Sequence, residues 1–229
     1  MTIHGMPTLY LVRHGQASFG AADYDNLSDL GVKQAVALGQ YFHAKNIRFD
    51  AAYMGALKRH AQTYAGISQG MASSQLARTR PGLNEYDSDA VVHAIHPEPL
   101  SQEKSPENYR KHFRLLRDGL AAWMAGTVSP LGMPAYPDFV KGITDVLDEV
   151  RAEFGAKEDA RILICSSGGP ISTAVGHILG TSSQTTIELN LRIRNSSITE
   201  FAFTPKRHML VTYNTLPHLE DKPHWVTYA

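Results

Sequence analysis

The sequence predicts an α/β protein, a three-layer sandwich in which helices cover both faces of a mostly parallel central sheet. Short apolar runs rich in β-branched and aromatic residues are typical of buried strands. They alternate along the chain with longer runs whose apolar residues recur at helical spacing. Such an alternation is typical of a parallel sheet with helices on both faces. It is interrupted at about 84–137, and this interruption predicts an inserted helical cap.

The first part of the chain contains two predicted units of strand and helix. An apolar strand ends near Arg13, and a loop with Gly and Asp leads to a helix. Ser28 precedes the first apolar residues of this helix and is predicted to cap it. The elements that follow are a short strand at 49–55, a helix at 56–70 and an extended segment at 76–83.

The second part begins with the interruption and then returns to the alternation. Ser105 as a cap and Pro106 at the first helical position predict a helix within the interruption. No internal repeat or low-complexity linker divides the chain. We therefore expect a single domain over 1–229, with the cap at about 84–137. The remaining predicted elements are a helix at 138–154, a strand at 160–167, a helix at 170–180, and strands around 197–203 and 208–213.

The composition limits the partners and the compartment. Lys plus Arg and Asp plus Glu both number 22 in 229 residues, so no net charge favours nucleic acid or an anionic membrane. A single cysteine, Cys165, excludes an internal disulfide and a cysteine-rich zinc site, and its apolar strand predicts an inert core residue. No apolar run approaches the length of a membrane span, and the first residues lack a signal-like pattern. We expect a cytoplasmic protein with no nucleic-acid or membrane partner.

Three features follow predicted strands and could meet at one edge of the sheet. Arg13, His14 and Gly15 directly follow the first strand, where open α/β sheets bind their ligands. Arg59 lies near the start of the second helix, and residues 164–172 form a strand, a Gly-Gly turn and a helix start. Two arginine forks and the free amides of such a turn suit a phosphate group. Taken alone, the tripeptide fits a structural ion pair and a buried histidine equally well.

In this order and spacing the motifs resemble those of the histidine phosphatase superfamily, also called the phosphoglycerate-mutase-like family. The matching segments are LVRHG, LSDLGVKQA, LKRHAQT, LNEYD, NSSIT and NTLPHL. The resemblance implies that His14 is the nucleophile and becomes a phosphohistidine. It implies that Arg13 and Arg59 bind the phosphoryl oxygens and that Glu85 protonates the leaving oxygen. It implies no cofactor and no metal, and it leaves a homodimer open.

One turn departs from the family pattern. Most members have Ser-His-Gly-Gly where this chain has Ser166 to Gly169, so Ser167 occupies the place of the second active-site histidine. The chain resembles bacterial members with serine at this position. We expect the Ser167 hydroxyl and the Gly168 amide to contact phosphate. Loss of the charged imidazole would cost about 10²- to 10³-fold in rate, which impairs an enzyme without abolishing its activity.

The loop after His14 and the cap bear on the type of reaction. In the mutase branch this loop holds phosphate, which implies Gln16 as a further phosphate ligand, and Ser18 is retained. Residues 19–26 depart from the mutase pattern, and the cap shows no obvious set of basic residues for a bisphosphoglycerate. The resemblance thus favours a metal-independent phosphatase acting on a small phosphomonoester. A mutase, or a weakened enzyme that binds a phosphorylated ligand, remains an alternative.

The remaining histidines receive other interpretations. His93 and His96 have a spacing that could hold a metal, but the following proline favours a surface loop, from which either could approach the phosphate if the cap closes. His60 follows Arg59 on a different helix face and is interpreted as structural or peripheral. His218 matches a family feature and is interpreted as a support for the site.

Overall fold

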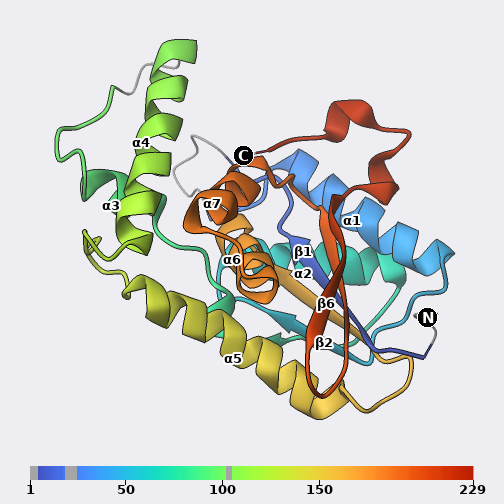
Figure 1. The fold of residues 1–229 in the computed structure, drawn as a ribbon. Helices are drawn as coiled ribbons and strands as arrows, with labels where there is room; N and C mark the ends of the chain where they lie inside the picture. The colour runs from blue at the N-terminus through green and yellow to red at the C-terminus, as the bar shows by residue number, and fades with distance from the viewer. Residues whose placement is uncertain (1–4, 19–24, 102–104, 229) are drawn as a thin grey trace.

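The computed structural model describes residues 5–18, 25–101 and 105–228 and contains a central sheet of six strands (Figure 1). The strand order across the sheet is β3-β2-β4-β1-β5-β6. The pairs β3-β2, β2-β4 and β4-β1 are parallel, whereas β5 is antiparallel to both of its neighbours. The prediction of a mostly parallel sheet is therefore confirmed. The strands are β1 (Thr8–Arg13), β2 (Ala51–Met54), β3 (Arg78–Thr79), β4 (Arg161–Ser166), β5 (Ile198–Phe203) and β6 (His208–Thr215).

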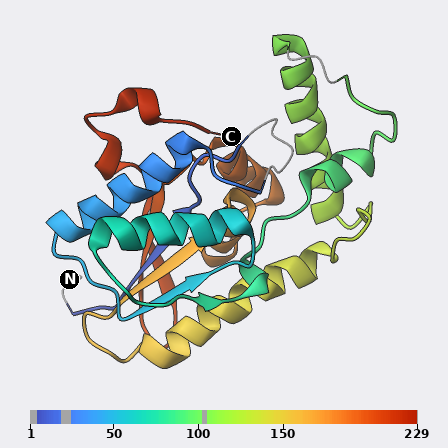
Figure 2. The ribbon, with the colours of Figure 1, turned by 180° about the vertical axis from the view of Figure 1, so that it is seen from behind.

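Helices cover both faces of this sheet, as expected. Helices α1 and α2 lie side by side on one face, and α5 and α6 lie on the other (Figures 1 and 2). Among the helices of the described segments, none is both long and apolar enough to cross a membrane. The helices are α1 (Asp29–Ala44), α2 (Lys58–Met71), α3 (Ser88–His93), α4 (Pro106–Met124), α5 (Tyr136–Phe154), α6 (Gly168–Leu179) and α7 (Ser183–Arg192), with short 3-10 turns at Pro81–Leu83, Pro217–Leu219 and Pro223–Trp225.

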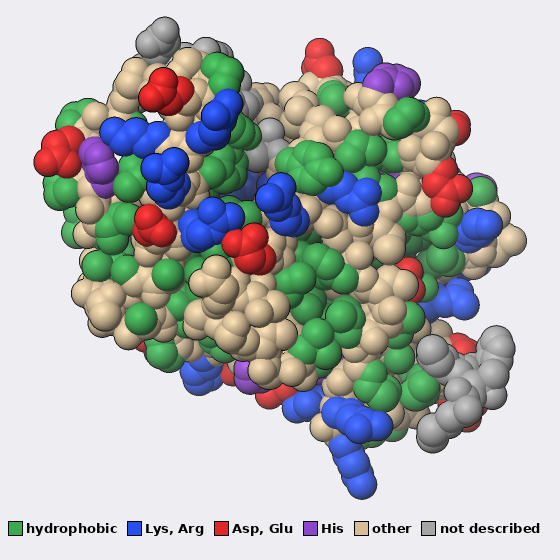
Figure 3. All heavy atoms as spheres, turned by 45° about the horizontal axis from the view of Figure 1, so that its top comes forward, with side chains coloured by type: hydrophobic (Ala, Val, Ile, Leu, Met, Phe, Trp, Pro, Cys, Tyr) green, Lys and Arg blue, Asp and Glu red, His purple; other side chains and the backbone are tan. Residues whose placement is uncertain are grey.

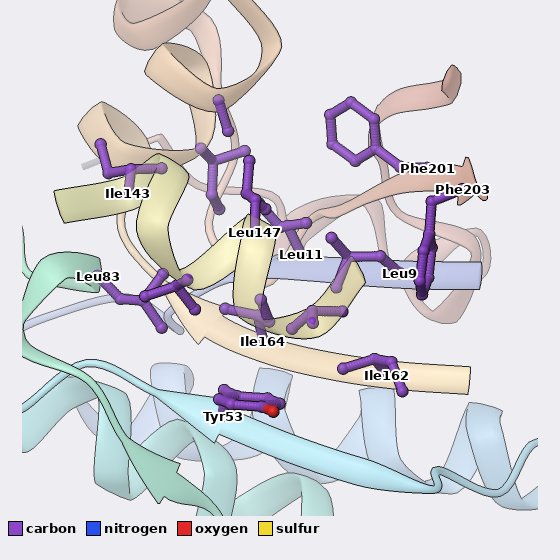
Figure 4. Packing of buried hydrophobic residues seen from close by; sticks show 14 of the residues in the cluster. Leu9, Leu11, Tyr53, Leu83, Ile143, Leu147, Ile162, Ile164, Phe201 and Phe203 are labelled. Atoms are coloured by element: carbon purple, nitrogen blue, oxygen red, sulfur yellow. The ribbon is translucent and has the colours of Figure 1, made fainter. Parts of the chain in front are cut away.

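The core is divided between the two faces of the sheet. Side chains alternate along a strand, so Leu9 and Leu11 of β1 pack with Leu147 of α5 (Figure 4). Tyr10 and Val12 of the same strand belong to the cluster on the opposite face, with α1 and α2. A strand covered on both faces reads as a continuous apolar run. The strand that was inferred from such a run therefore forms the centre of the sandwich.

Helices α3 and α4 stand to one side of the sandwich and share an apolar cluster with α7 (Figures 1 and 2). Trp123 of α4 is almost fully buried there and donates its indole N–H to the carbonyl of Pro134 at 3.0 Å. The predicted N-cap residue of helix α4 is confirmed, because the Ser105 hydroxyl accepts from the backbone N–H of Asn108. Ser28 caps α1 in the same way, by accepting from Gly31.

Two helices and one boundary were not predicted correctly. Helix α7 buries only Thr186 and Ile187, so its sequence carries no apolar stripe. Helix α3 is a single short stretch within the polar part of the cap. The extended segment expected at 76–83 forms only the two-residue strand β3, because the chain turns into a 3-10 helix that begins at Pro81.

Candidate active site

The ends of β1 and β4 lie side by side at one edge of the sheet. Arg13 at the end of β1 pairs with Ser166 at the end of β4, and the next N–H, that of His14, donates to the Ser166 carbonyl at 2.8 Å. His14 and Ser167 are therefore neighbouring residues on adjacent parallel strands. Strand β2 ends beside β4 and leads to α2, which carries Arg59. The structure thus brings together the three features that were expected at the strand ends.

His14 is buried and held in one tautomer. Its Nδ1 lies 2.7 Å from the carbonyl oxygen of Gly15, and a carbonyl can only accept, so Nδ1 carries the hydrogen. Burial, together with Arg13 and Arg59, holds the pKa of His14 well below its ordinary value. The imidazole is neutral at physiological pH, and its Nε2 carries a lone pair that can attack an electrophile.

The backbone around His14 is fixed by packing. A Cβ on Gly15 would lie 2.3 Å from the carbonyl oxygen of Gly31, so only glycine permits this close approach of the loop to α1. The carbonyl of His14 accepts from the N–H of Ser196 at 3.1 Å. The buried His218 contacts the Ser196 hydroxyl through Nε2 at 3.0 Å. His218 therefore supports the loop that holds His14, in agreement with its interpretation.

Arg59 lies in the first turn of α2 and forms an ion pair that the sequence did not reveal. Its Nη1 lies 2.9 Å from Oδ1 of Asp25, and the other carboxylate oxygen of Asp25 accepts from the backbone N–H of Lys58 at 2.9 Å. Asp25 thus caps the N-terminus of α2 and orients the guanidinium of Arg59 with the same carboxylate. The side chain of Arg59 is only 10% exposed.

Arg13 is anchored by backbone carbonyls. Its Nη1 donates to the carbonyl of Ile193 at 2.5 Å and to the carbonyl of Tyr228. A Cβ on Gly168 would lie 3.7 Å from Nε of Arg13, so the guanidinium reaches the turn after β4. Tyr228 comes from the C-terminal tail, and a contact of this kind between distant segments leaves no local pattern in the sequence. The binding of phosphoryl oxygens by Arg13 stays a prediction.

Glu85 faces the N-terminus of α6. Its two carboxylate oxygens lie 3.1 and 3.2 Å from the backbone nitrogen of Gly169, which donates to them. Burial raises the pKa of Glu85 above its ordinary value, although nearby Arg59 opposes the shift. A Cβ on Gly169 would lie 2.2 Å from Oε1 of Glu85, so the second glycine of the turn makes room for this carboxylate. A carboxyl group with a raised pKa suits general acid chemistry.

Ser167 and His60 form a buried pair. Nε2 of His60 lies 2.7 Å from Oγ of Ser167, and neither residue is exposed. The ring of His60 also lies 6.0 Å from that of His14. Of the two interpretations of His60, peripheral is therefore wrong, whereas a structural role stays open. The peripheral interpretation fails because residues 59 and 60 both lie in the first turn of α2, which begins at the carboxyl ends of the strands, so side chains about 100° apart can both reach the site.

The other predicted residues lie in different surroundings. The side-chain oxygen of Gln16 accepts from the Ser28 hydroxyl at 2.8 Å, which ties the loop after His14 to α1. His93 ends α3 and is exposed, and His96 lies 3.4 Å from a carboxylate oxygen of Glu98. In the part of the chain that the structure describes, no three His, Cys, Asp or Glu side chains form a cluster that could hold a metal. The binding of phosphate by Gln16 stays a prediction.

Burial raises the pKa of the Cys165 thiol, which lies in the core as expected. Residues 19–24, which were expected to depart from the mutase loop, lie outside the described residues.

The cap carries three arginines on one helix, although nothing places them at the strand ends. Arg110, Arg114 and Arg117 are spaced at i, i+4 and i+7 on α4 and so share one helix face. Arg117 pairs at 2.9 Å with Glu188 of α7, while Arg110 and Arg114 are exposed. Figure 3 shows Lys and Arg side chains gathered on the side of the molecule that the cap forms. The spacing of the three arginines can be seen in the sequence. Only the ion pair between Arg117 and Glu188 shows which way this helix face points.

A small cavity of about 20 Å³ lies between the cap and the sandwich. It adjoins Gly169 and Tyr86, and aromatic side chains from α4 and α5 form much of its wall. Tyr86 is held by the side-chain amide of Asn190, which donates to its hydroxyl at 2.7 Å. Because Tyr86 directly follows Glu85, this cavity lies beside the acid group. Its residues include Tyr86, Trp123, Tyr136, Phe139, Gly169 and Asn190.

Curated relatives match part of the chain. A 2,3-bisphosphoglycerate-dependent phosphoglycerate mutase from Mesorhizobium japonicum is 38% identical over 88 residues, which make up 35% of this chain and 42% of that protein. The same enzyme from Brucella anthropi is 36% identical over 87 residues, with the same two coverages. The matched part therefore spans about two fifths of the length of these relatives.

Solved structures match the fold over nearly the whole chain. A phosphoglycerate mutase from Bacillus anthracis has a TM-score of 0.66 and 21% identity, and covers 94% of this chain and 96% of its own. A phosphoserine phosphatase from Entamoeba histolytica has a TM-score of 0.64 and 22% identity, and covers 93% and 100%. The sequence model of the histidine phosphatase superfamily (branch 1) matches residues 9–216. The chain belongs to the histidine phosphatase superfamily.

Proposed function

We propose that the protein is a phosphatase that hydrolyses a small phosphomonoester through a phosphohistidine on His14, with no requirement for a metal. The observation that carries this proposal is the tautomer of His14. Its Nδ1 donates to Gly15, so Nε2 is the atom with the lone pair, and the imidazole is neutral. A neutral imidazole nitrogen among arginines at the edge of the sheet suits nucleophilic attack on phosphorus.

The first step transfers the phosphoryl group to the enzyme. Nε2 of His14 forms a bond to phosphorus while the bond between phosphorus and the ester oxygen breaks. Glu85 gives its proton to the leaving oxygen, and its raised pKa supports a protonated form at the start of the cycle. Arg13 and Arg59 stabilise the charge on the three remaining oxygens of the transferring group.

The second step returns the enzyme to its starting state. Water attacks the phosphohistidine, and the Glu85 carboxylate accepts a proton from that water. The bond between phosphorus and Nε2 breaks, and inorganic phosphate leaves with neutral His14 restored. The amide of Gly169 donates to Glu85, so it stabilises the carboxylate that forms between the two steps.

The organic part of the substrate is expected to extend toward the cap. The cavity beside Tyr86 is largely apolar, and its position next to Glu85 matches the side on which the leaving oxygen departs. At about 20 Å³ the cavity holds little more than a water molecule, so it marks this side of the site without enclosing the organic group.

The test is hydrolysis of a panel of phosphomonoesters by the purified protein and by His14→Asn. The panel contains an aryl phosphate, an alkyl phosphate, phosphoserine and 3-phosphoglycerate, each measured with and without a chelator. We expect release of inorganic phosphate by the wild type alone, unchanged by the chelator. Activity that the chelator removes and a divalent metal restores would contradict the metal-independent reaction. Equal activity in His14→Asn would contradict the role of His14.

A mutase is the second candidate, and the exposed Arg110 and Arg114 on the cap favour it. A mutase substrate carries a second anionic group, and basic side chains on the cap could bind such a group. The curated relatives named above are mutases, although they match only part of the chain. Conversion of 3-phosphoglycerate to 2-phosphoglycerate in the presence of a bisphosphoglycerate, faster than phosphate release, would support this candidate over the phosphatase.

A further inference from the structure

We propose that His60 is a positioning residue that turns the Ser167 hydroxyl toward the transferring phosphoryl group, so that α2 supplies the imidazole that the turn after β4 lacks. This inference rests on the proposed function of the site, since it concerns the same phosphoryl group. His60 itself does not touch the phosphate and acts on it through Ser167.

The position of Ser167 places its hydroxyl beside the nucleophile. Ser167 follows β4 as His14 follows β1, and Arg13 and Ser166 are paired in the parallel register. The next amide, that of His14, donates to the Ser166 carbonyl at 2.8 Å. A group bound to Nε2 of His14 is therefore near the residue that follows Ser166.

The hydroxyl of Ser167 does not cap its own helix. Ser167 is the N-cap of α6, yet its side chain accepts no hydrogen bond from the first turn. Three other serines at helix N-caps each accept from the backbone N–H of the third residue of the helix; they are Ser28, Ser105 and Ser182. The common use of a serine at this position is capping. Ser167 departs from that use because its Oγ lies 2.7 Å from Nε2 of His60.

The chain makes room for the ring of His60. A Cβ on Gly55 would lie 2.2 Å from Nδ1 and 2.7 Å from Cε1 of His60. Gly55 has no positive φ, so its backbone conformation is open to other residues. Glycine is thus required here by the imidazole and not by the turn.

The chemistry of phosphate fixes the direction of the hydrogen bond between the two side chains. A phosphate dianion only accepts, so a serine hydroxyl bound to it uses its single hydrogen for that contact. His60 must then donate from Nε2 to Oγ of Ser167, which leaves Nδ1 without a hydrogen. In agreement with this, Nδ1 of His60 has no hydrogen-bond partner among the described residues. Burial and the neighbouring Arg59 lower the pKa of His60 to about 3, so the ring carries only one hydrogen near neutral pH.

The test compares six variants with the wild type. Four of them are His60→Ala, Ser167→Ala, their double variant, and the exchange His60→Ala with Ser167→His. His60→Gln is the conservative variant, because its amide can still donate to Ser167. His208→Gln is the matched control, since His208 is a buried histidine on β6, packed against Phe201 and Phe203. The readouts are kcat and KM for an aryl phosphate, binding of inorganic phosphate by calorimetry, and the melting temperature.

We expect His60→Ala and Ser167→Ala each to lower kcat/KM about 10- to 100-fold and to weaken phosphate binding. The double variant should lose no more than the worse single variant, because both changes remove the same donor. His60→Gln should recover part of the loss. The exchange variant should have a higher kcat/KM than His60→Ala. Its Ser167→His change places an imidazole directly in the turn, in the space that the ring of His60 no longer fills.

The inference is overturned if the losses of the two single variants multiply in the double variant. It is also overturned if His60→Ala and His60→Gln lower the melting temperature as His208→Gln does but leave kcat and phosphate binding unchanged. Binding of inorganic phosphate requires no turnover. If the wild type binds phosphate but hydrolyses no ester in the panel, the proposed function fails while the role of His60 is still decided by the binding data.

Discussion

Strands β1 and β4 end side by side, yet the two ends supply different side chains to the same small region. At the end of β1 the strand itself provides an imidazole, His14, whose tautomer is set by its neighbour Gly15. At the end of β4 the strand provides a hydroxyl, that of Ser167, and the imidazole beside it comes from α2. The difference teaches that neighbouring strand ends can be furnished with the same kind of group by different segments, one by the chain that follows the strand and one by a helix.

The first prediction separates the two buried histidines by the size of their effects. His14→Asn should lower kcat for an aryl phosphate at least about 10⁴-fold, because no other group can form the covalent intermediate. His60→Ala should cost at most about 100-fold in the same assay, because it acts on a single hydrogen-bond donor. Steady-state kinetics on both variants, each checked for folding by its melting temperature, measures this contrast. Losses of equal size would erase the distinction between the two strand ends.

The second prediction concerns the acid that lies across the turn after β4. Glu85→Gln should slow alkyl phosphates by about 10²- to 10⁴-fold and nitrophenyl phosphates much less, because only a poor leaving group needs a proton in the transition state. Since burial raises the pKa of Glu85, kcat for alkyl phosphates in the wild type should fall as pH rises through that raised value. This fall of kcat with rising pH should be absent from Glu85→Gln.

Gly169→Ala is the matched variant for Glu85, because a Cβ there would lie 2.2 Å from Oε1 of Glu85 and displace the carboxylate. It should reproduce the dependence on the leaving group. Equal slowing of alkyl and nitrophenyl esters in Glu85→Gln would assign the proton donor to another residue, with Asp87 as the next candidate.

The third prediction concerns the pH dependence of stability, because His14 and His60, like His208 and His218, are buried and neutral. In the unfolded chain a histidine binds its proton near pH 6.5. In the folded chain burial lowers the pKa of His60 and His218 to about 3 and that of His208 to about 4, and holds that of His14 well below its ordinary value. Below about pH 6.5 the unfolded state therefore binds more protons than the folded state, and stability must fall with falling pH.

The expected size of this effect is about 2 to 3 kcal/mol for each of His60, His208 and His218 between pH 6.5 and 4.5, partly opposed by the raised pKa of Glu85. The free energy of unfolding, measured in urea at a series of pH values, gives the slope. His208→Gln should flatten that slope by about one proton. A stability that is constant from pH 7 to 4.5 would show that these histidines titrate normally in the folded state.

Much of the fold could be predicted because its signals are local. The apolar run that ends at Arg13 is buried on both faces of the sheet, and the caps at Ser28 and Ser105 form as their residue types indicate. Helix α7 could not be found in this way, since only two of its residues are buried and its place is set by packing against α4 and α6. The boundary of the cap at about 84–137 stays a prediction.

The site could be predicted only in part. His14 and Arg59 lie in motifs whose positions along the chain indicate the strand ends, whereas Glu85 was implied only by the family resemblance. The pair of His60 with Ser167 and that of Asp25 with Arg59 join segments far apart in the sequence, so no local pattern contains them. A peripheral position was one of the two alternatives for His60 because adjacent helical residues normally face different surroundings, a rule that does not hold in the first turn of a helix aimed at the site.

The position of the phosphoryl group on the enzyme during turnover tests the account most directly. The protein is mixed with an aryl phosphate, quenched in alkali, where phosphohistidine is stable, and digested for mass spectrometry. We expect one acid-labile phosphoryl group on His14 in the wild type. The label should be absent from His14→Asn, and in His60→Ala it should appear on His14 at a lower rate. A phosphoryl group on His60 or Ser167, or full turnover with no labelled peptide, would contradict the assignment of His14 as the nucleophile.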